Sequence, residues 1–148
     1  AIHRLKYEGR RPLARPLARL VCDRLAIDGA PGMGLLAVPL HRSRLARRGF
    51  NQSELIVREL RVRLRLPEPP GRLVRARDTP AQVGLDRAHR LANVSGAFDW
   101  QGPDLGGMPV ILVDDVITTG ATLEACAAAL RAGGAGAISG LTVARVSF

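Results

Sequence analysis

Apolar residues recur three or four positions apart in two segments of the chain. The first segment runs from Arg11 to Ile27 and has Pro12 and Pro16 near its first turns, where a helix tolerates proline. The second segment runs from Asn51 to Leu66. Both patterns predict amphipathic helices. Their predicted apolar faces consist of Leu13, Leu17, Leu20, Val21 and Leu25 in the first segment, and of Leu55, Ile56, Leu60 and Leu64 in the second.

Short runs of aliphatic residues predict buried strands, because a strand covered on both faces is continuously apolar. Turn-forming or acidic residues end these runs before a helical period can develop. Three strands are predicted: Leu35 to Val38, which Pro39 follows; Val110 to Val113, which Pro109 starts and Asp114 and Asp115 end; and Ile138 to Val146.

An alanine-rich helix is predicted from Gly120 to Ala132, closed by Gly133 and Gly134. Strands therefore alternate with helices, which favours an α/β domain with a mostly parallel sheet. Ligands bind such sheets at the carboxyl ends of the strands. Between Pro67 and Trp100 the pattern weakens to turns, short apolar pieces and a polar helix near Asp86–Asn93.

The composition fits one domain: the chain has 148 residues, of which 47% are hydrophobic. No apolar run approaches the roughly 20 residues that span a bilayer, so we expect no membrane span. Cys22 and Cys126 are far apart and lie in apolar segments. We expect both to be small buried side chains, with no zinc site. Nothing requires an oxidising compartment, so we expect a cytoplasmic protein.

Charge narrows the class of ligand. The 22 basic residues outnumber the 13 acidic ones, which gives a net charge of +9. A field of this sign attracts polyanions, such as nucleic acid or a pyrophosphorylated sugar. Aromatic residues make up only 3% of the chain, too few for an extended base-stacking surface.

The segment that joins the strand at Val110 to the helix at Gly120 carries the most distinctive chemistry. Its hydroxyls and backbone amides would surround an anion at the N-terminus of a helix. Asp114 and Asp115 cannot bind a phosphate and need another partner, such as sugar hydroxyls or a magnesium shell. A Walker A loop needs a Lys after the Gly, and a dinucleotide loop needs more glycines. The alternative, in which Asp and Thr only cap the helix, explains less of the segment.

A second polar segment follows the predicted strand at Leu35. An arginine there could hold pyrophosphate, because its planar guanidinium pairs bidentately with phosphate oxygens. The alternative, that Arg44, Arg47 and Arg48 only solvate a loop, stays open. Asn51 is predicted to cap the helix that follows it. The residues expected at pyrophosphate are Pro39, Leu40, His41, Arg42 and Arg44.

The string from Val113 to Thr122 resembles the signature of type I phosphoribosyltransferases that binds phosphoribosyl pyrophosphate (PRPP). The resemblance implies a type I phosphoribosyltransferase fold and Mg²⁺ that arrives with the substrate, without direct protein ligands. It assigns the ribose hydroxyls, and with them the catalytic role, to Asp114 and Asp115. It assigns the 5′-phosphate to Thr118, Thr119, Gly120, Ala121 and Thr122.

Further motifs are similar to the ComF family of competence and GntX-like proteins, so the resemblance covers nearly the whole chain. They are Leu5 to Tyr7, Val38 to Leu40, Arg48 to Ser53, Arg75, Thr79, Gln82 and Arg90 to Phe98. The family usually has an N-terminal zinc ribbon, which this sequence lacks, so we expect a piece of a longer protein. Thr118 stands where 6-oxopurine transferases have a general-base Asp, which argues against hypoxanthine or guanine as acceptor.

The resemblance implies one phosphoribosyltransferase domain over residues 1–148, with a small hood from about 1–10 and 67–100. We expect it to transfer phosphoribose from Mg²⁺-PRPP to an undefined nitrogen nucleophile, with release of pyrophosphate. The alternative is a binding module of the same fold that senses PRPP or a nucleotide, or handles single-stranded DNA. The sequence does not decide between enzyme and module, and it leaves the oligomeric state open.

Overall fold

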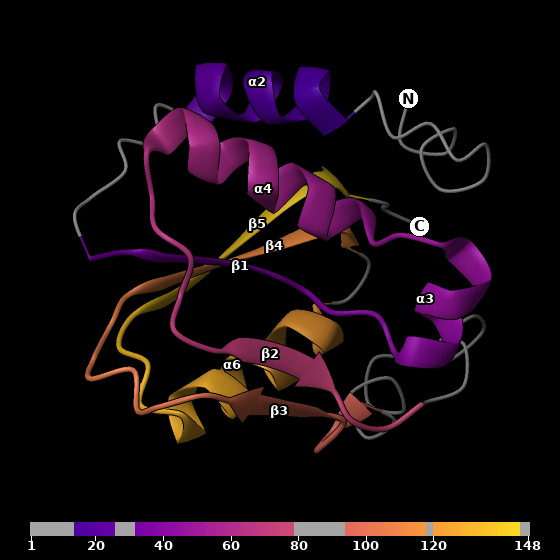
Figure 1. Ribbon diagram of the computed structural model, residues 1–148, viewed down its shortest axis with the longest axis vertical. Helices are drawn as coiled ribbons and strands as arrows, with labels where there is room; N and C mark the ends of the chain where they lie inside the picture. Colours follow the sequence, from indigo (N-terminus) through magenta and orange to yellow (C-terminus); the bar gives the residue numbers. More distant parts are fainter. Residues whose placement is uncertain (1–13, 26–31, 79–93, 118–119, 146–148) are drawn as a thin grey trace.

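The computed structural model describes residues 14–25, 32–78, 94–117 and 120–145. Its central sheet contains β1 (Gly34–Ala37), β4 (Val110–Ile117) and β5 (Ile138–Arg145) in the order β1-β4-β5. Both pairs of neighbours are parallel, with Leu36 opposite Leu112 and Leu112 opposite Gly140. The predicted α/β architecture with a mostly parallel sheet is confirmed (Figure 1).

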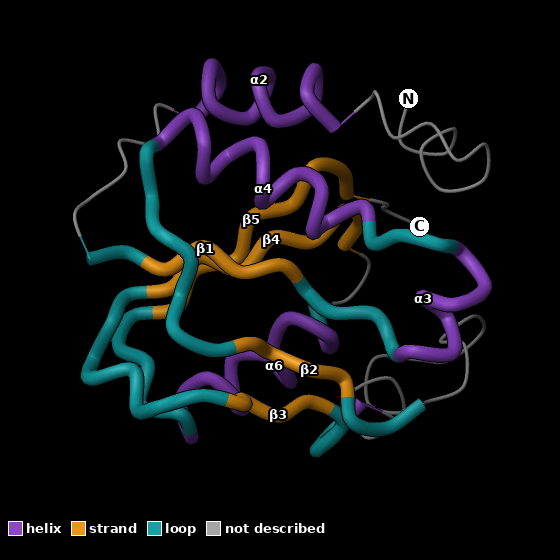
Figure 2. The backbone as a smooth tube through the Cα atoms, viewed as in Figure 1, coloured by secondary structure: helices purple, strands orange, loops and turns teal. Residues whose placement is uncertain are grey.

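Helices cover the two faces of this sheet. On one face lie α2 (Ala14–Leu25) and α4 (Gln52–Leu64), and on the other lies α6 (Ala121–Ala132), beside the hairpin-like pair β2 (Arg72–Arg75) and β3 (Phe98–Gln101) (Figures 1 and 2). Alternation along a strand sends successive side chains to opposite faces, so each strand contributes to two cores. The α2/α4 core includes Ala18, Leu35, Ile56, Leu60 and Val113. The α6 core includes Leu36, Phe98, Leu112, Cys126 and Leu130.

The two predicted amphipathic helices are present, with corrections to their faces. In α2, Leu17 and Val21 are buried as expected, but Leu20 is 51% exposed and the small Ala18 takes the inward position. In α4, Ile56 and Leu60 are buried as predicted, and Val57 joins them. Leu20 directly precedes Val21, and neighbouring residues of a helix point in different directions. Leu20 therefore lies at the edge of the buried stripe, although it is only three positions from Leu17.

Caps fix the ends of α4 and α6 as predicted. Asn51 caps α4: its Oδ1 accepts from the Ser53 amide at 3.1 Å, and its Nδ2 donates to the Val38 carbonyl at 3.0 Å. The second bond ties the start of α4 to the end of β1. Helix α6 begins after Gly120 and ends at Gly133.

Several predicted boundaries are wrong. Strand β1 runs from Gly34 to Ala37 rather than from Leu35 to Val38, and α4 ends at Leu64 rather than at Leu66. The strand predicted to stop before Asp114 continues to Ile117, because β5 pairs with it over the whole length and supplies hydrogen bonds regardless of side-chain polarity. Asp114 and Asp115 are therefore strand residues, and the loop proper is shorter than predicted.

Three further elements were not predicted. Helix α3 (Arg42–Arg48) has no buried residue, and caps at His41 and Gly49 define it. Strands β2 and β3 pair antiparallel, with Arg75 opposite Phe98. Strands β2 and β3 belong to the expected hood segment, but their residues Leu73 and Phe98 are buried in the α6 core. The rest of the expected hood, residues 1–10 and 79–93 with the polar helix, lies outside the described residues, and the hood stays a prediction.

Candidate functional site

The two polar segments leave the same edge of the sheet. Strands β1 and β4 are parallel neighbours, and the Val38 amide donates to the Val113 carbonyl at 2.9 Å where β1 ends, while β4 continues to Ile117. From β1 the chain continues through α3 to α4, and α4 covers one face of the sheet. From β4 the chain continues to α6, which covers the other face. Chains that diverge from adjacent strand ends leave a crevice between them, the usual ligand position in such sheets.

The β4–α6 connection forms one side of this position. Gly120 has φ 83°, a left-handed conformation that suits glycine, and its carbonyl accepts from the Glu124 amide at 2.9 Å. A glycine gives no side-chain cap, so the first amides of α6 are available to an anion. Ala121 is buried beneath them, while Thr122 is half-buried. Thr118 and Thr119 lie outside the described residues.

The two aspartates share the end of β4 but differ in direction. Alternation places Asp114 on the face of Leu112 and Asp115 on the opposite face. The Asp114 carboxylate accepts from the Asp115 amide at 2.8 Å. Burial raises the pKa of the Cys126 thiol in the α6 core, and the negative charge of Asp114 raises it further. Cys126 is therefore a neutral buried side chain, as predicted, and Cys22 is partly buried.

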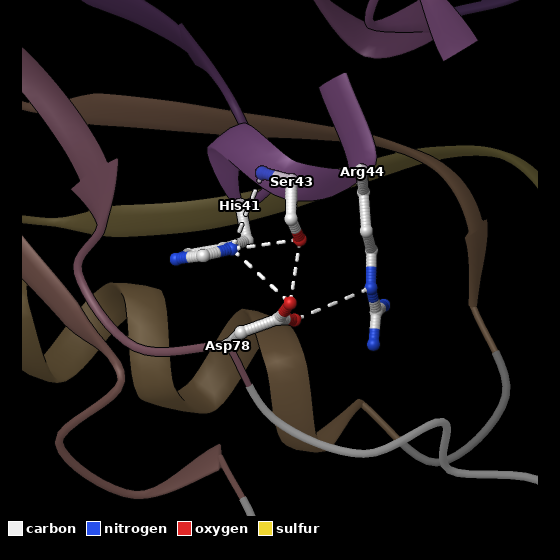
Figure 3. Close-up of polar contacts among 4 residues, drawn as sticks. All are labelled: His41, Ser43, Arg44 and Asp78. Atoms are coloured by element: carbon white, nitrogen blue, oxygen red, sulfur yellow. Dashed lines mark hydrogen bonds and ion pairs between the residues drawn. The ribbon is translucent and has the colours of Figure 1, made fainter. Parts of the chain in front are cut away.

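A cluster of four polar residues forms the other side, and we call it the Asp78 cluster: His41, Ser43, Arg44 and Asp78 (Figure 3). The Ser43 hydroxyl donates to Asp78 Oδ2 at 2.5 Å. His41 Nδ1 lies 3.0 Å from the Ser43 hydroxyl and 3.3 Å from Asp78 Oδ2. Arg44 Nε lies 3.7 Å from Asp78 Oδ1. Residues at the start of α3 thus surround one carboxylate from the segment after β2.

Hydrogen positions in this cluster follow from the donors available. The Ser43 hydroxyl donates to Asp78, and the Ser43 amide donates to His41 Nδ1 at 3.4 Å, which caps α3. Nδ1 accepts in the cap when it carries no hydrogen, and it donates towards the Ser43 and Asp78 oxygens when it carries one, so its role follows the tautomer of the ring. A Ser-His-Asp catalytic relay is excluded, because there the serine donates to one ring nitrogen and the aspartate accepts from the other.

Positive charge gathers around the carboxylate. The Ser43 hydrogen bond contributes most to lowering the pKa of Asp78, and the charges of His41, Arg44 and Arg75 lower it further. Burial lowers the pKa of the Arg75 guanidinium, and the charge of Arg44 lowers it too. Arg75 lies over the Phe98 ring, 5.3 Å from its centroid.

The residues predicted for pyrophosphate are thus only partly brought together. His41 and Arg44 join the Asp78 cluster, and Pro39 and Leu40 are half-buried between β1 and α3. Arg42 is exposed in the first turn of α3 and shows no contact with the cluster. Ser43 lies in the polar segment after the strand at Leu35 that was predicted to hold pyrophosphate, although it was not among the residues assigned there. Asp78 was not predicted, since its contact with Ser43 spans 35 positions.

Within the described parts of the chain, no three His, Cys, Asp or Glu side chains are grouped so that they could hold a metal ion. In the same parts, no helix is both long and apolar enough to cross a membrane.

Relatives of this chain have been named for DNA-related processes. The DNA utilization protein YhgH of Escherichia coli K12 is 35% identical over 142 residues, 93% of this chain and 62% of that protein. Competence protein F of Haemophilus influenzae is 34% identical over 139 residues, 88% of this chain and 60% of that protein. The chain therefore spans about three fifths of the length of these relatives. No protein-family model matches it.

The solved structures define the fold. A hypoxanthine phosphoribosyltransferase from Staphylococcus aureus superposes with a TM-score of 0.53 over 89% of this chain and 62% of its own, at 12% identity. Together with the parallel sheet and flanking helices, this establishes the type I phosphoribosyltransferase fold. By sequence, the chain belongs to the ComF-like family that includes the YhgH and competence F proteins.

Proposed function

We propose that this domain binds Mg²⁺-PRPP at the carboxyl edge of β1 and β4 and transfers its phosphoribosyl group to a nitrogen nucleophile, with release of pyrophosphate. One observation carries the proposal. The carboxylates of β4 and the first amides of α6 follow one strand and the cations of α3 follow another, and these two strands are adjacent and parallel. PRPP needs such a pair of sites, because it carries a phosphate at one end and a pyrophosphate at the other.

The β4–α6 side suits the ribose 5′-phosphate. Amides at a helix N-terminus bind phosphate through aligned dipoles, and Gly120 permits close approach of the backbone. Thr118, Thr119 and Thr122 would add hydroxyl donors. Asp114 and Asp115 are acceptors, so they would bind ribose hydroxyls rather than phosphate.

The α3 side suits the leaving pyrophosphate. His41, Ser43 and Arg44 offer donors towards one anion, and Arg75 adds charge behind them. Bond breaking at C1 of the sugar would leave a cationic, oxocarbenium-like ribose, and the carboxylates of β4 lie at the edge where they could stabilise it. Mg²⁺, when bound with PRPP, would neutralise the leaving pyrophosphate; the carboxylate oxygens of Asp114 and Asp115 are ligands that suit it or its waters.

The experiment removes the β4 carboxylates while keeping their size. Asp114→Asn with Asp115→Asn should weaken binding of Mg²⁺-PRPP about 100-fold in calorimetry, because two hydrogen bonds to charged groups are each worth about 1.5–3 kcal/mol. The control, Asp23→Asn with Asp99→Asn, removes the same charge from exposed positions. Equal affinity in the site variant and the parent would overturn the site assignment.

Transfer itself needs a separate assay, since the acceptor is undefined. Release of pyrophosphate from Mg²⁺-PRPP should require an added nitrogen base, and a panel of purines, pyrimidines and simple amines would identify its class. Tight PRPP binding without release for any acceptor would favour a PRPP-sensing module in the cytoplasm over an enzyme.

A second candidate is the handling of single-stranded DNA. It is favoured by the names of the relatives, a DNA utilization protein and a competence protein, and by the net charge of +9. Stacking surface is scarce, however: Phe98 is buried, and Trp100 donates to the Pro103 carbonyl at 2.8 Å and packs on Gly133. We therefore expect weak binding that falls steeply with salt, as phosphate contacts do. Titration of a labelled oligonucleotide at low and near-physiological salt tests this. Tight, salt-resistant binding that PRPP does not displace would favour the DNA module.

A further inference from the structure

The Asp78 cluster contains an anion already. The Asp78 carboxylate receives the Ser43 hydrogen bond at 2.5 Å and faces His41 Nδ1 at 3.3 Å and Arg44 Nε at 3.7 Å. These are hydroxyl, imidazole and guanidinium groups, the donors that also bind phosphate oxygens. Both carboxylate oxygens are used, Oδ2 by Ser43 and His41 and Oδ1 by Arg44 (Figure 3). The carboxylate therefore occupies an anion-binding position formed by the start of α3.

The contacts between Asp78 and the residues of α3 are partly exposed to solvent rather than buried. The Asp78 side chain is 46% exposed, while those of His41 and Arg44 are only 15% and 26% exposed. Two of the three donors are thus less exposed than the acceptor, and Ser43 is exposed with it. Exposed ion pairs of this kind contribute little to stability, so the carboxylate can leave at low cost.

Charge explains why a carboxylate is present at all. The charge of Arg44 disfavours the positive charge of Arg75, and the charge of Asp78 favours it. Without a ligand, the carboxylate of Asp78 offsets this repulsion. A dianionic group that entered the same position would do so more strongly, but it could not share the position with a carboxylate.

We infer that Asp78 is an internal competitor of pyrophosphate: its carboxylate holds the donors of His41, Ser43 and Arg44 until the pyrophosphate group of PRPP displaces it. This rests on the proposed function, because it assigns pyrophosphate to the α3 side of the site. A tethered competitor lowers the apparent affinity for the anion, because only the fraction of molecules in which the site is open can bind it. It also returns to the donors when pyrophosphate leaves, which speeds product release.

The test is a titration of inorganic pyrophosphate without metal into the whole chain, followed by calorimetry. Asp78→Asn should bind pyrophosphate about fivefold more tightly than the parent, the upper end of what an exposed ion pair contributes. Asp78→Ala should do the same, and it removes any hydrogen bond that an Asn amide keeps to Ser43. Asp23→Asn is the matched control, because it removes one exposed carboxylate from α2, far from α3 in Figure 1. Melting curves establish that each variant is folded.

Two additional arms separate contact from long-range repulsion and from failure of the site. In about 0.5 M NaCl, where the screening length is about 4 Å, the gain should persist if Asp78 competes by contact. A gain that vanishes there would overturn the inference. Arg44→Ala should weaken pyrophosphate binding in the parent. If it does so while both Asp78 variants bind no tighter than the parent, the inference fails and the proposed function stands. No pyrophosphate binding by any variant would overturn both.

Discussion

The two sides of the site hold anions by different means. The β4–α6 side uses backbone amides, ordered by a left-handed Gly120 and the first turn of α6. The Asp78 cluster uses charged side chains, and its anion position is filled by a residue of the chain itself. The first side is formed by consecutive residues, whereas the second joins α3 to a residue 35 positions later.

This difference follows from what each kind of donor needs without a ligand. Amides at a helix end can hydrogen-bond to water at little cost, so they need no internal partner. A guanidinium group is disfavoured by another positive charge and stabilised by a counter-charge, as Arg44 disfavours and Asp78 favours the charge of Arg75. We therefore expect the amide side to respond to backbone changes and the cationic side to respond to charge changes.

The largest effect should come from the backbone of the amide side. Gly120→Ala and Gly49→Ala both place a Cβ at a positive φ, 83° and 76°, and each should lower the free energy of unfolding by about 1–2 kcal/mol. Only Gly120→Ala should also weaken Mg²⁺-PRPP binding, by about tenfold, because its Cβ would stand where the phosphate approaches. Denaturant unfolding and calorimetry measure the two effects. Equal loss of affinity in both variants would show that strain, not position, matters.

A smaller effect should separate Arg42 from Arg44, two of the four arginines of α3. Arg44→Ala should weaken Mg²⁺-PRPP binding about fivefold, and Arg42→Ala about twofold, since only Arg44 belongs to the Asp78 cluster. The exposed Arg58 of α4 provides a control for loss of net charge, and Arg58→Ala should leave the affinity unchanged. If Arg42→Ala had the larger effect, the cluster would not be the pyrophosphate side.

The smallest effect concerns pH. The folded pKa of Asp78 lies below its ordinary value, so its contacts add stability above about pH 4 and lose it as the pH falls through the folded pKa. The difference in melting temperature between the parent and Asp78→Asn should therefore be constant near neutral pH and shrink below about pH 4. A difference that grows in acid would contradict the assigned contacts.

Parts of the molecule with local signals could be predicted from the sequence. The aliphatic run of Val110 to Val113, the caps at Asn51 and Gly120 and the alanine-rich α6 each follow from neighbouring residues. The amide side of the site belongs to this group, which is why its position could be predicted.

Other parts depend on distant partners. The polar half of β4 is a strand only because β5 lies beside it, and the four-residue strands β2 and β3 have too few positions to show a period. Helix α3 buries nothing, so its sequence has no apolar stripe. Asp78 lacked any local motif, and its contacts depend on where α3 begins and β2 ends in space.

The most direct test of the central claim is an NMR titration of the labelled chain with Mg²⁺-PRPP. The account predicts that amide resonances of residues 120–123 at the start of α6 and of 42–44 at the start of α3 shift together and saturate with one dissociation constant. Single-site binding across the edge of β1 and β4 requires this. Shifts in only one of the two groups, or in neither at saturating PRPP, would contradict it.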